Sequence, residues 1–117
     1  LAGKVDGIFI PNDSVIQSAM TTVTEVARDK KIPVYGSSKA MVLSGAFATV
    51  AISDTKIGKL TAQMGLKYLK DGTTVKDIPS VVVPAEETVI NQNTLDALGV
   101  TVPDDIKNSA IIVNDAE

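Results

Sequence analysis

Short apolar runs alternate along this chain with segments in which apolar residues recur every three to four positions. The runs predict strands of a parallel sheet, which are apolar on both faces, and the longer period predicts helices that bury one face. Strands are expected at Val5 and 8–10, 32–36, 47–52, 80–83, 88–90 and 110–113; helices are expected at 15–30, 55–70, 93–98 and 103–108, with a helical turn at 40–43. This order predicts an α/β fold, a Rossmann-like and mainly parallel sheet flanked by helices.

Small polar residues follow three of the predicted strands. They are Asn12, Asp13 and Ser14 after the first strand, Ser37 and Ser38 after the second, and Ser53 and Asp54 after the third. The carboxyl ends of parallel strands share one edge of a sheet, and open α/β sheets bind ligands at that edge. The sequence therefore predicts a binding site built from these seven residues. The Asp13 carboxylate would suit an ammonium group, and the turn at 37–39 would suit a carboxylate.

The same residues also fit a purely structural interpretation. Asn12–Ser14 has the composition of a turn, with Ser14 as the expected N-cap of helix 15–30, and Ser53 would cap helix 55–70. From spacing alone both interpretations stay open. Their convergence on one sheet edge favours the binding site.

Composition narrows the class of function. The 117 residues, 44% hydrophobic and 21% charged, suit one globular domain with a real core. The net charge of −3 gives no electrostatic case for binding nucleic acid. The chain has neither cysteine nor histidine and no glycine-rich phosphate loop, so we expect no catalytic residues, no metal and no cofactor. A phospho-receiver domain, with Asp13 as acceptor and Lys39 as its cation, is the remaining enzyme-like alternative.

A set of motifs resembles a known family. Residues 6–13, 18–20, 32–36 and 48–50, in this order and spacing, resemble the ABC-transporter substrate-binding proteins of the tryptophan/tyrosine type, which are similar to the type I periplasmic-binding-protein superfamily. The resemblance continues through 57–58 and 89–100 and covers nearly the whole chain. It corresponds to the second half of a family member. Because the chain begins with Leu1 rather than Met, we also expect it to be part of a longer polypeptide.

The resemblance implies a two-lobed, hinged receptor that closes on a small polar solute such as an amino acid. Residues 1–117 would be its C-terminal lobe, with about 48–75 crossing to pack on the N-terminal lobe and the seven polar residues lining the cleft. Such a receptor delivers its solute to a membrane permease and works outside the cytoplasm, in the periplasm or anchored to lipid.

Two further expectations follow. The ligand-sensing domain of a transcription regulator shares this fold and is the alternative function; it would need a helix-turn-helix upstream. The apolar stripe of helix 55–70 (Ile57, Leu60, Met64 and Tyr68) would be left uncovered in the isolated chain, which we therefore expect to form a homodimer.

Overall fold

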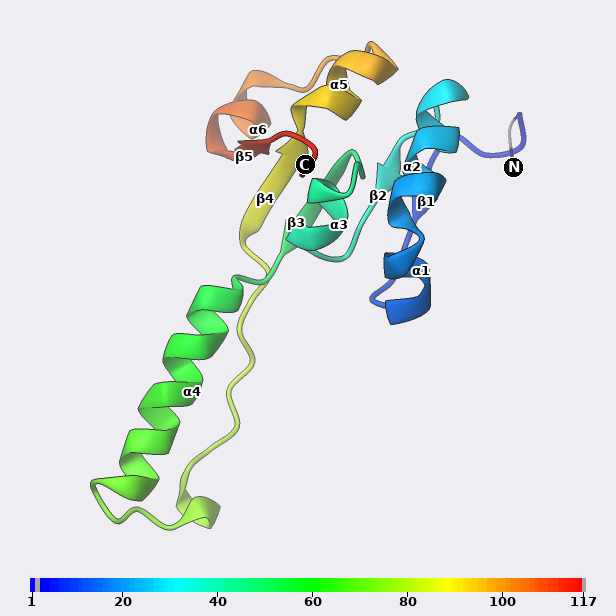
Figure 1. Cartoon of the computed structure of the whole chain (residues 1–117). Helices are drawn as coiled ribbons and strands as arrows, with labels where there is room; N and C mark the ends of the chain where they lie inside the picture. Colours follow the sequence, from blue (N-terminus) through cyan, green and yellow to red (C-terminus); the bar gives the residue numbers. More distant parts are fainter. Residues whose placement is uncertain (2, 117) are drawn as a thin grey trace. The chain divides into compact units, whose positions relative to one another are not determined.

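The computed structural model describes residue 1 and residues 3–116. Within them, one sheet has the strand order β1-β2-β3-β4-β5 (Figure 1). The strands are β1 (Ile8–Phe9), β2 (Val34–Tyr35), β3 (Ala48–Ala51), β4 (Glu87–Asn91) and β5 (Ile111–Val113). β1, β2 and β3 are parallel, β4 is antiparallel to β3, and β5 is parallel to β4. The predicted α/β class, with a mainly parallel sheet flanked by helices, is confirmed.

The helices are α1 (Ser14–Ser18), α2 (Met20–Asp29), α3 (Lys39–Leu43), α4 (Asp54–Leu69), α5 (Gln92–Leu98) and α6 (Asp104–Ser109), with a 3₁₀ turn, η1, at Val75–Asp77. The single helix expected over 15–30 is interrupted at Ala19. There the Ser18 hydroxyl donates to the Val15 carbonyl at 2.7 Å, and the Ala19 N–H donates to the Ile16 carbonyl at 3.0 Å. A serine hydroxyl that bonds to the backbone in this way competes with helix continuation.

The chain divides into two compact units. The first comprises residues 1–51 and 87–117, and the second comprises residues 52–86. The division falls after Ala51 rather than near residue 48, because residues 48–51 form β3 and pair with β4.

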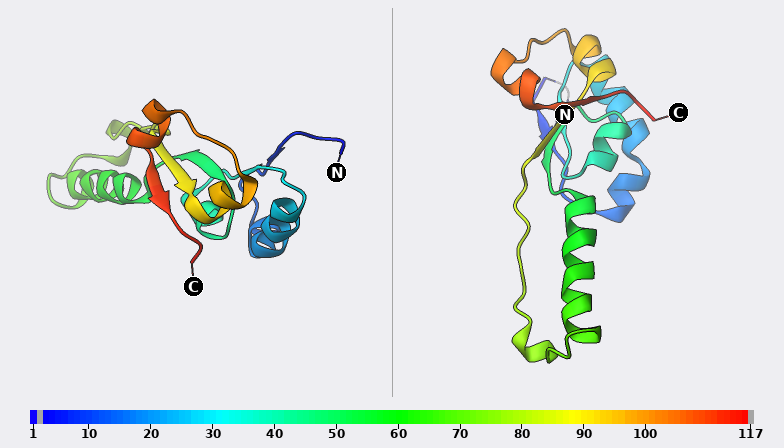
Figure 2. Two further views of the ribbon diagram at one scale, coloured as in Figure 1. Left: turned by 90° about the horizontal axis from the view of Figure 1, so that it is seen from above. Right: turned by 90° about the vertical axis from the view of Figure 1, so that its left-hand side faces the viewer.

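The core of the first unit lies on both faces of the sheet. On one face, α2 and α3 pack against the strands, and the buried cluster is Ile10, Met20, Ala27, Val34, Met41, Val42, Ala46 and Val89. The other face carries a smaller cluster of Phe47, Ile90, Leu95 and Leu98, with Val102 and Ala110 packed against it. Figure 2 shows α2 and α3 on one side of the sheet and α6 on the other.

The second face is only partly covered. Register places Phe9, Tyr35 and Ala48 in one row across β1, β2 and β3, and Val50 lies two residues further along the same face. Phe9 is 68% exposed, Tyr35 42% and Val50 60%. The expectation that strand 8–10 is buried on both faces is therefore wrong: Ile10 is buried beneath α2, whereas Phe9 points to the uncovered face.

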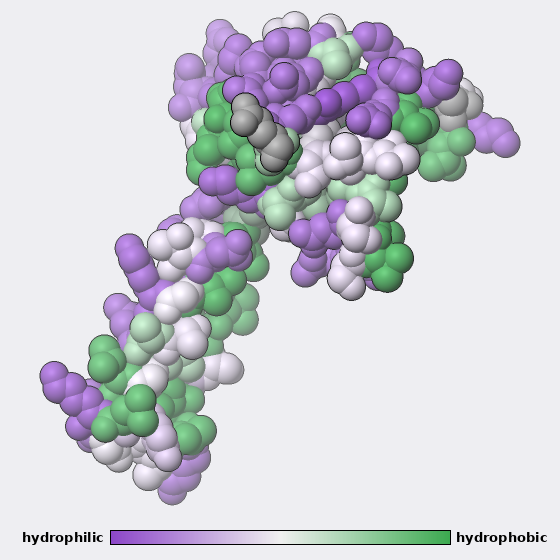
Figure 3. Space-filling model, in the orientation of Figure 1, coloured by the Kyte–Doolittle hydropathy of each residue, from purple (hydrophilic) through white to green (hydrophobic). Residues whose placement is uncertain are grey.

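The second unit consists of α4, η1 and the segment that returns to β4. Residues 80–83, expected as a strand, form none, because they have no ladder partner within the described part of the chain. They share an open hollow of about 380 Å³ with Ile57, Leu60 and Met64 of α4. Apolar surface runs along this unit in the space-filling view (Figure 3). Within residues 3–116, no helix is both long and apolar enough to cross a bilayer.

Candidate ligand-binding edge

Two of the three predicted polar loops meet at one edge of the first unit. Phe9 pairs in parallel with Tyr35, so the chain leaves β1 and β2 at the same edge of the sheet. The loop after β1 carries Asn12, Asp13 and Ser14, and the loop after β2 carries Ser37 and Ser38. The third pair, Ser53 and Asp54, belongs to the second unit.

Asp13 is the N-cap of α1. Its Oδ1 atom accepts from the Val15 N–H at 2.9 Å and from the Ile16 N–H at 3.0 Å, and its backbone is extended. The expectation that Ser14 caps this helix is wrong, since Ser14 is the first helical residue. Oδ1 alone accepts from these two amides, which have no partner within the helix. The Oδ2 atom of this exposed residue therefore has no partner among the described residues. Asp13 therefore caps α1, as the structural interpretation of this loop requires, and its second carboxylate oxygen is not used by the cap.

The loop after β2 is tightly built. Ser38 caps α3, its Oγ accepting from the Met41 N–H at 3.4 Å, and the Ser37 Oγ lies 3.6 Å from the Met41 Sδ. A Cβ on Gly36 would stand 2.7 Å from the Met41 Cβ, so only glycine allows α3 this close to β2. Ser37 also lines an open hollow of about 470 Å³, which extends over the uncovered sheet face beside Phe9.

Ser53 and Asp54 begin α4 in the second unit. The Ser53 Oγ accepts from the Lys56 N–H at 3.4 Å, which is the N-cap expected from the sequence. Asp54 is exposed in the first helical turn, where a negative charge is favourable to the helix dipole.

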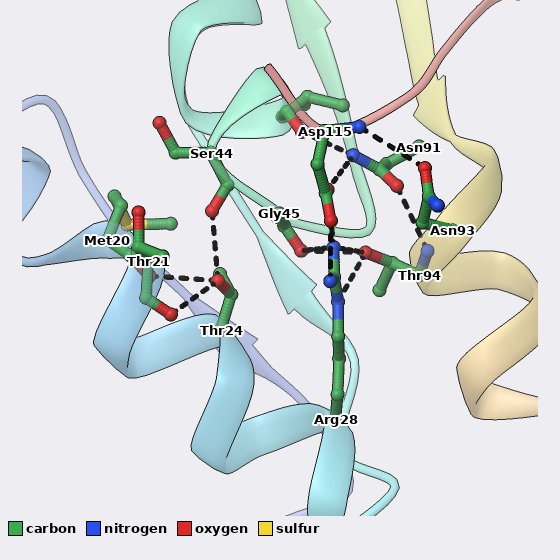
Figure 4. Close-up of polar contacts among 11 residues, drawn as sticks. Met20, Thr21, Thr24, Arg28, Ser44, Gly45, Asn91, Asn93, Thr94 and Asp115 are labelled. Atoms are coloured by element: carbon green, nitrogen blue, oxygen red, sulfur yellow. Dashed lines mark hydrogen bonds and ion pairs between the residues drawn. The ribbon is translucent and has the colours of Figure 1, made fainter. Parts of the chain in front are cut away.

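A polar network at the opposite sheet edge was missed by the sequence analysis (Figure 4). Arg28 of α2 forms a two-pronged ion pair with Asp115 near the C-terminus, at 2.8 and 2.7 Å. The buried Asn91 amide donates to the Val42 carbonyl at 2.7 Å and to Asp115 at 2.8 Å. Thr94 donates its hydroxyl to the Gly45 carbonyl at 2.8 Å. No spacing in the sequence could have joined partners 87 positions apart.

The charge of Asp115 is stabilised by this network. The hydrogen bond from Arg28 lowers the pKa of the Asp115 carboxyl below its ordinary value, and the Asn91 hydrogen bond acts in the same direction. Partial burial opposes them by raising the pKa. The network therefore favours the charged form of Asp115 and holds its carboxylate in place.

Among the described residues, neither a metal centre nor a phospho-receiver arrangement is visible. Within the described part of the chain, no three Asp or Glu side chains gather as a metal site would require. The described ion pairs join Arg28 to Asp115 and Lys56 to Glu86, and none joins Asp13 to Lys39.

Comparison with known proteins identifies the family. The family model described as ABC transporter substrate binding protein matches residues 1–114. The chain belongs to this family. The family is one of binding proteins rather than enzymes, which fits the expected lack of catalysis, and the regulator alternative is not favoured.

Individual proteins and solved structures that are similar to this chain agree with the family assignment. A tyrosine-binding protein of Clostridioides difficile (strain R20291) is 38% identical over 98 residues, which are 84% of this chain and 28% of that protein. A ligand-free, open structure of a substrate binding protein with adhesive properties from Clostridium difficile superposes with a TM-score of 0.82 at 31% identity, over 99% of this chain and 38% of that one. An ABC domain from Streptococcus pneumonia in complex with L-Trp has a TM-score of 0.82 at 33% identity, over 96% and 38%.

The 117-residue chain is therefore much shorter than these relatives. It spans 28% of the curated relative and 38% of each of these two solved chains.

Proposed function

We propose that the chain is the C-terminal lobe of a solute-binding receptor of an ABC importer, which closes on an amino acid or a similar small polar ligand. The family match supports the receptor class. The relatives named for tyrosine binding and solved with L-Trp support an amino acid as ligand. On this proposal the second unit crosses to pack on an N-terminal lobe. The receptor works outside the cytoplasm, in the periplasm or anchored to lipid, and hands its solute to a membrane permease.

The spare oxygen of Asp13 is the observation that supports the binding site most directly. An amino acid presents an ammonium and a carboxylate, and an exposed carboxylate oxygen is the natural partner of the ammonium. Asn12 and Ser14 are the neighbours of Asp13 in the chain and belong to the same loop. Ser37 and Ser38 offer hydroxyl groups at the same sheet edge for the carboxylate. Ser53 and Asp54 complete the proposed set from the second unit.

Calorimetric titration of the full-length protein with the common amino acids tests the proposal. We expect one or a few of them to bind, and Asp13→Asn to weaken that binding by about 1.5–3 kcal/mol, the range for a hydrogen bond to a charged group. Asparagine caps helices as well as aspartate does, so this variant removes the charge while keeping α1 capped. Asp104→Asn, which changes an exposed aspartate in the first turn of α6, is the control and should bind normally.

A comparison with Asp54→Asn shows which of the two carboxylates binds the ammonium group. If D13N binds like the unchanged protein and Asp54→Asn does not, the ammonium partner is Asp54, and the role given to Asp13 is wrong. If no amino acid binds at all, the ligand class is wrong.

A further inference from the structure

The C-terminal end of α3 is held by donors from three distant parts of the chain. The last carbonyl groups of a helix have no partners within the helix. Here the carbonyls of four consecutive residues each have a donor from elsewhere: Val42 from the Asn91 amide at 2.7 Å, Leu43 from the Ala116 N–H at 2.8 Å, Ser44 from the Thr24 hydroxyl at 2.9 Å and Gly45 from the Thr94 hydroxyl at 2.8 Å. These four contacts fix the position of this end.

Thr94 and Arg28 meet at the Gly45 carbonyl (Figure 4). The Arg28 Nε–H donates to the Thr94 hydroxyl oxygen at 2.8 Å, which leaves the hydroxyl proton for the Gly45 carbonyl. Gly45 has a φ of +99°, and a Cβ there would stand 2.6 Å from the Thr24 hydroxyl oxygen and 2.9 Å from the Arg28 Nη2. This end of α3 is therefore packed as closely as a glycine backbone allows.

The N-terminal end of α3 is the loop that carries Ser37 and Ser38. α3 has five residues, so at a rise of 1.5 Å per residue its two ends lie about 7 Å apart. Ser38 caps the helix, and the close approach of Gly36 to the fully buried Met41 leaves this end no room to slide. A close-packed interior transmits a displacement instead of absorbing it. A shift at Gly45 should therefore reach the loop.

We propose that Thr94 is a positioning residue for the ligand loop at Ser37 and Ser38, and that it acts through α3. A helix of five residues does not hold its conformation in water by itself, so its place depends on its buried side chains and on the contacts at its ends. The Thr94 hydroxyl supplies one of these contacts. Thr94 is 2% exposed and lies where β4 ends, away from the loop, so it does not bind the ligand itself. This rests on the proposed function, in which the loop receives the carboxylate of an amino acid.

Amide exchange in the full-length protein without ligand, followed by NMR, tests the positioning. Thr94→Val removes the hydroxyl and keeps the branched shape of the side chain. We expect the Met41 amide, which donates to the Ser38 Oγ at 3.4 Å, to exchange at least about threefold faster in this variant. The Val15 and Ile16 amides, which are capped in the loop after β1, are internal controls and should keep their rates. An unchanged Met41 rate in T94V overturns the proposal.

Leu98→Ala separates positioning from a loss of stability. Leu98 lies on the same helix as Thr94, α5, but packs in the cluster on the other sheet face, and its truncation should destabilise the fold at least as much as T94V does. At a temperature where both variants are folded, we expect T94V to weaken binding of the amino acid identified by titration about three- to twentyfold, whereas L98A binds normally. Thr94→Ser keeps the hydroxyl, so it should restore both the affinity and the Met41 rate.

Three results would contradict the positioning role. Equal weakening by T94V and L98A would mean that lost stability accounts for the effect. Failure of T94S to restore binding would mean that the methyl group, and not the hydroxyl, matters. A faster Met41 amide with unchanged affinity would mean that ligand binding does not depend on this loop. If no amino acid binds the unchanged protein, the proposed function fails, and the exchange rates alone then decide whether Thr94 positions the loop.

Discussion

Replacing Asn91 should be the most damaging single change to the polar network of the first unit. Its side chain is fully buried and makes three hydrogen bonds: to the Val42 carbonyl, to Asp115, and from the Thr94 N–H at 3.0 Å. Asn91→Ala leaves the buried Thr94 N–H without its partner, whereas the Val42 carbonyl keeps the Gly45 N–H at 3.0 Å. An unsatisfied buried group costs about 1–3 kcal/mol and each of the two other lost hydrogen bonds about 0.5–1.5 kcal/mol, so we expect a loss of about 2–5 kcal/mol. That is a large share of the roughly 5–15 kcal/mol by which domains are stable.

Denaturant unfolding of the full-length protein, followed by far-UV circular dichroism, measures this loss. Asn91→Asp separates its parts, because it keeps the acceptor that caps α5 but turns a negative oxygen toward the Val42 carbonyl and Asp115. We expect it to be destabilised as well. Asn93→Ala, an exposed neighbour with one 3.2 Å bond from the Asp115 N–H, should cost less than about 1 kcal/mol. A loss below about 1 kcal/mol for N91A would mean that water reaches the Thr94 N–H and that the network does not exclude solvent here.

Two further predictions concern acid stability and self-association. Because Arg28 lowers the folded pKa of Asp115 below 3.8, the pair stabilises the fold above that pH, and this stability is lost as pH falls through the lowered pKa. Asp115→Asn should therefore flatten the acid side of the stability curve, and equal slopes in acid unfolding would contradict this. The isolated 117-residue chain should dimerise through the second unit, where Val82 is 90% exposed. Val82→Lys should shift it toward monomer in light scattering, and a monomer at every concentration without that change would refute the idea.

The class of fold was predictable from the sequence because its signal is local. Apolar runs bounded by polar residues marked β2, β3 and β5, and the cap at Ser53 marked the start of α4. The wrong predictions concern features that depend on residues far away in the sequence. Exposure of Phe9 depends on which sheet face the helices cover, and residues 80–83 lack a strand partner despite three consecutive valines.

The candidate site was predictable only in part. Parallel pairing of β1 with β2 follows from the α/β pattern, and it is this pairing that brings Asp13 to the same edge as Ser37. Asp13 caps α1 instead of Ser14 because the helix begins one residue earlier than expected. Residue propensities do not locate a helix start to within one residue. The Arg28–Asp115 contact had no local signal at all.

The polar groups of the first unit have different roles at the two ends of its strands. At the edge where β3 begins and β4 ends, Arg28, Asp115 and Asn91 satisfy one another and fix the C-terminal segment to α2. At the edge where β1 and β2 end, Asp13 and Ser38 cap helices, and the second Asp13 oxygen is left facing solvent. Buried polar groups must be paired to avoid a penalty, whereas an exposed one is free to exchange water for a ligand. Under the proposed function, one end of the lobe would stay fixed while the other exchanges water for ligand, and the variants D13N and N91A test these two roles separately.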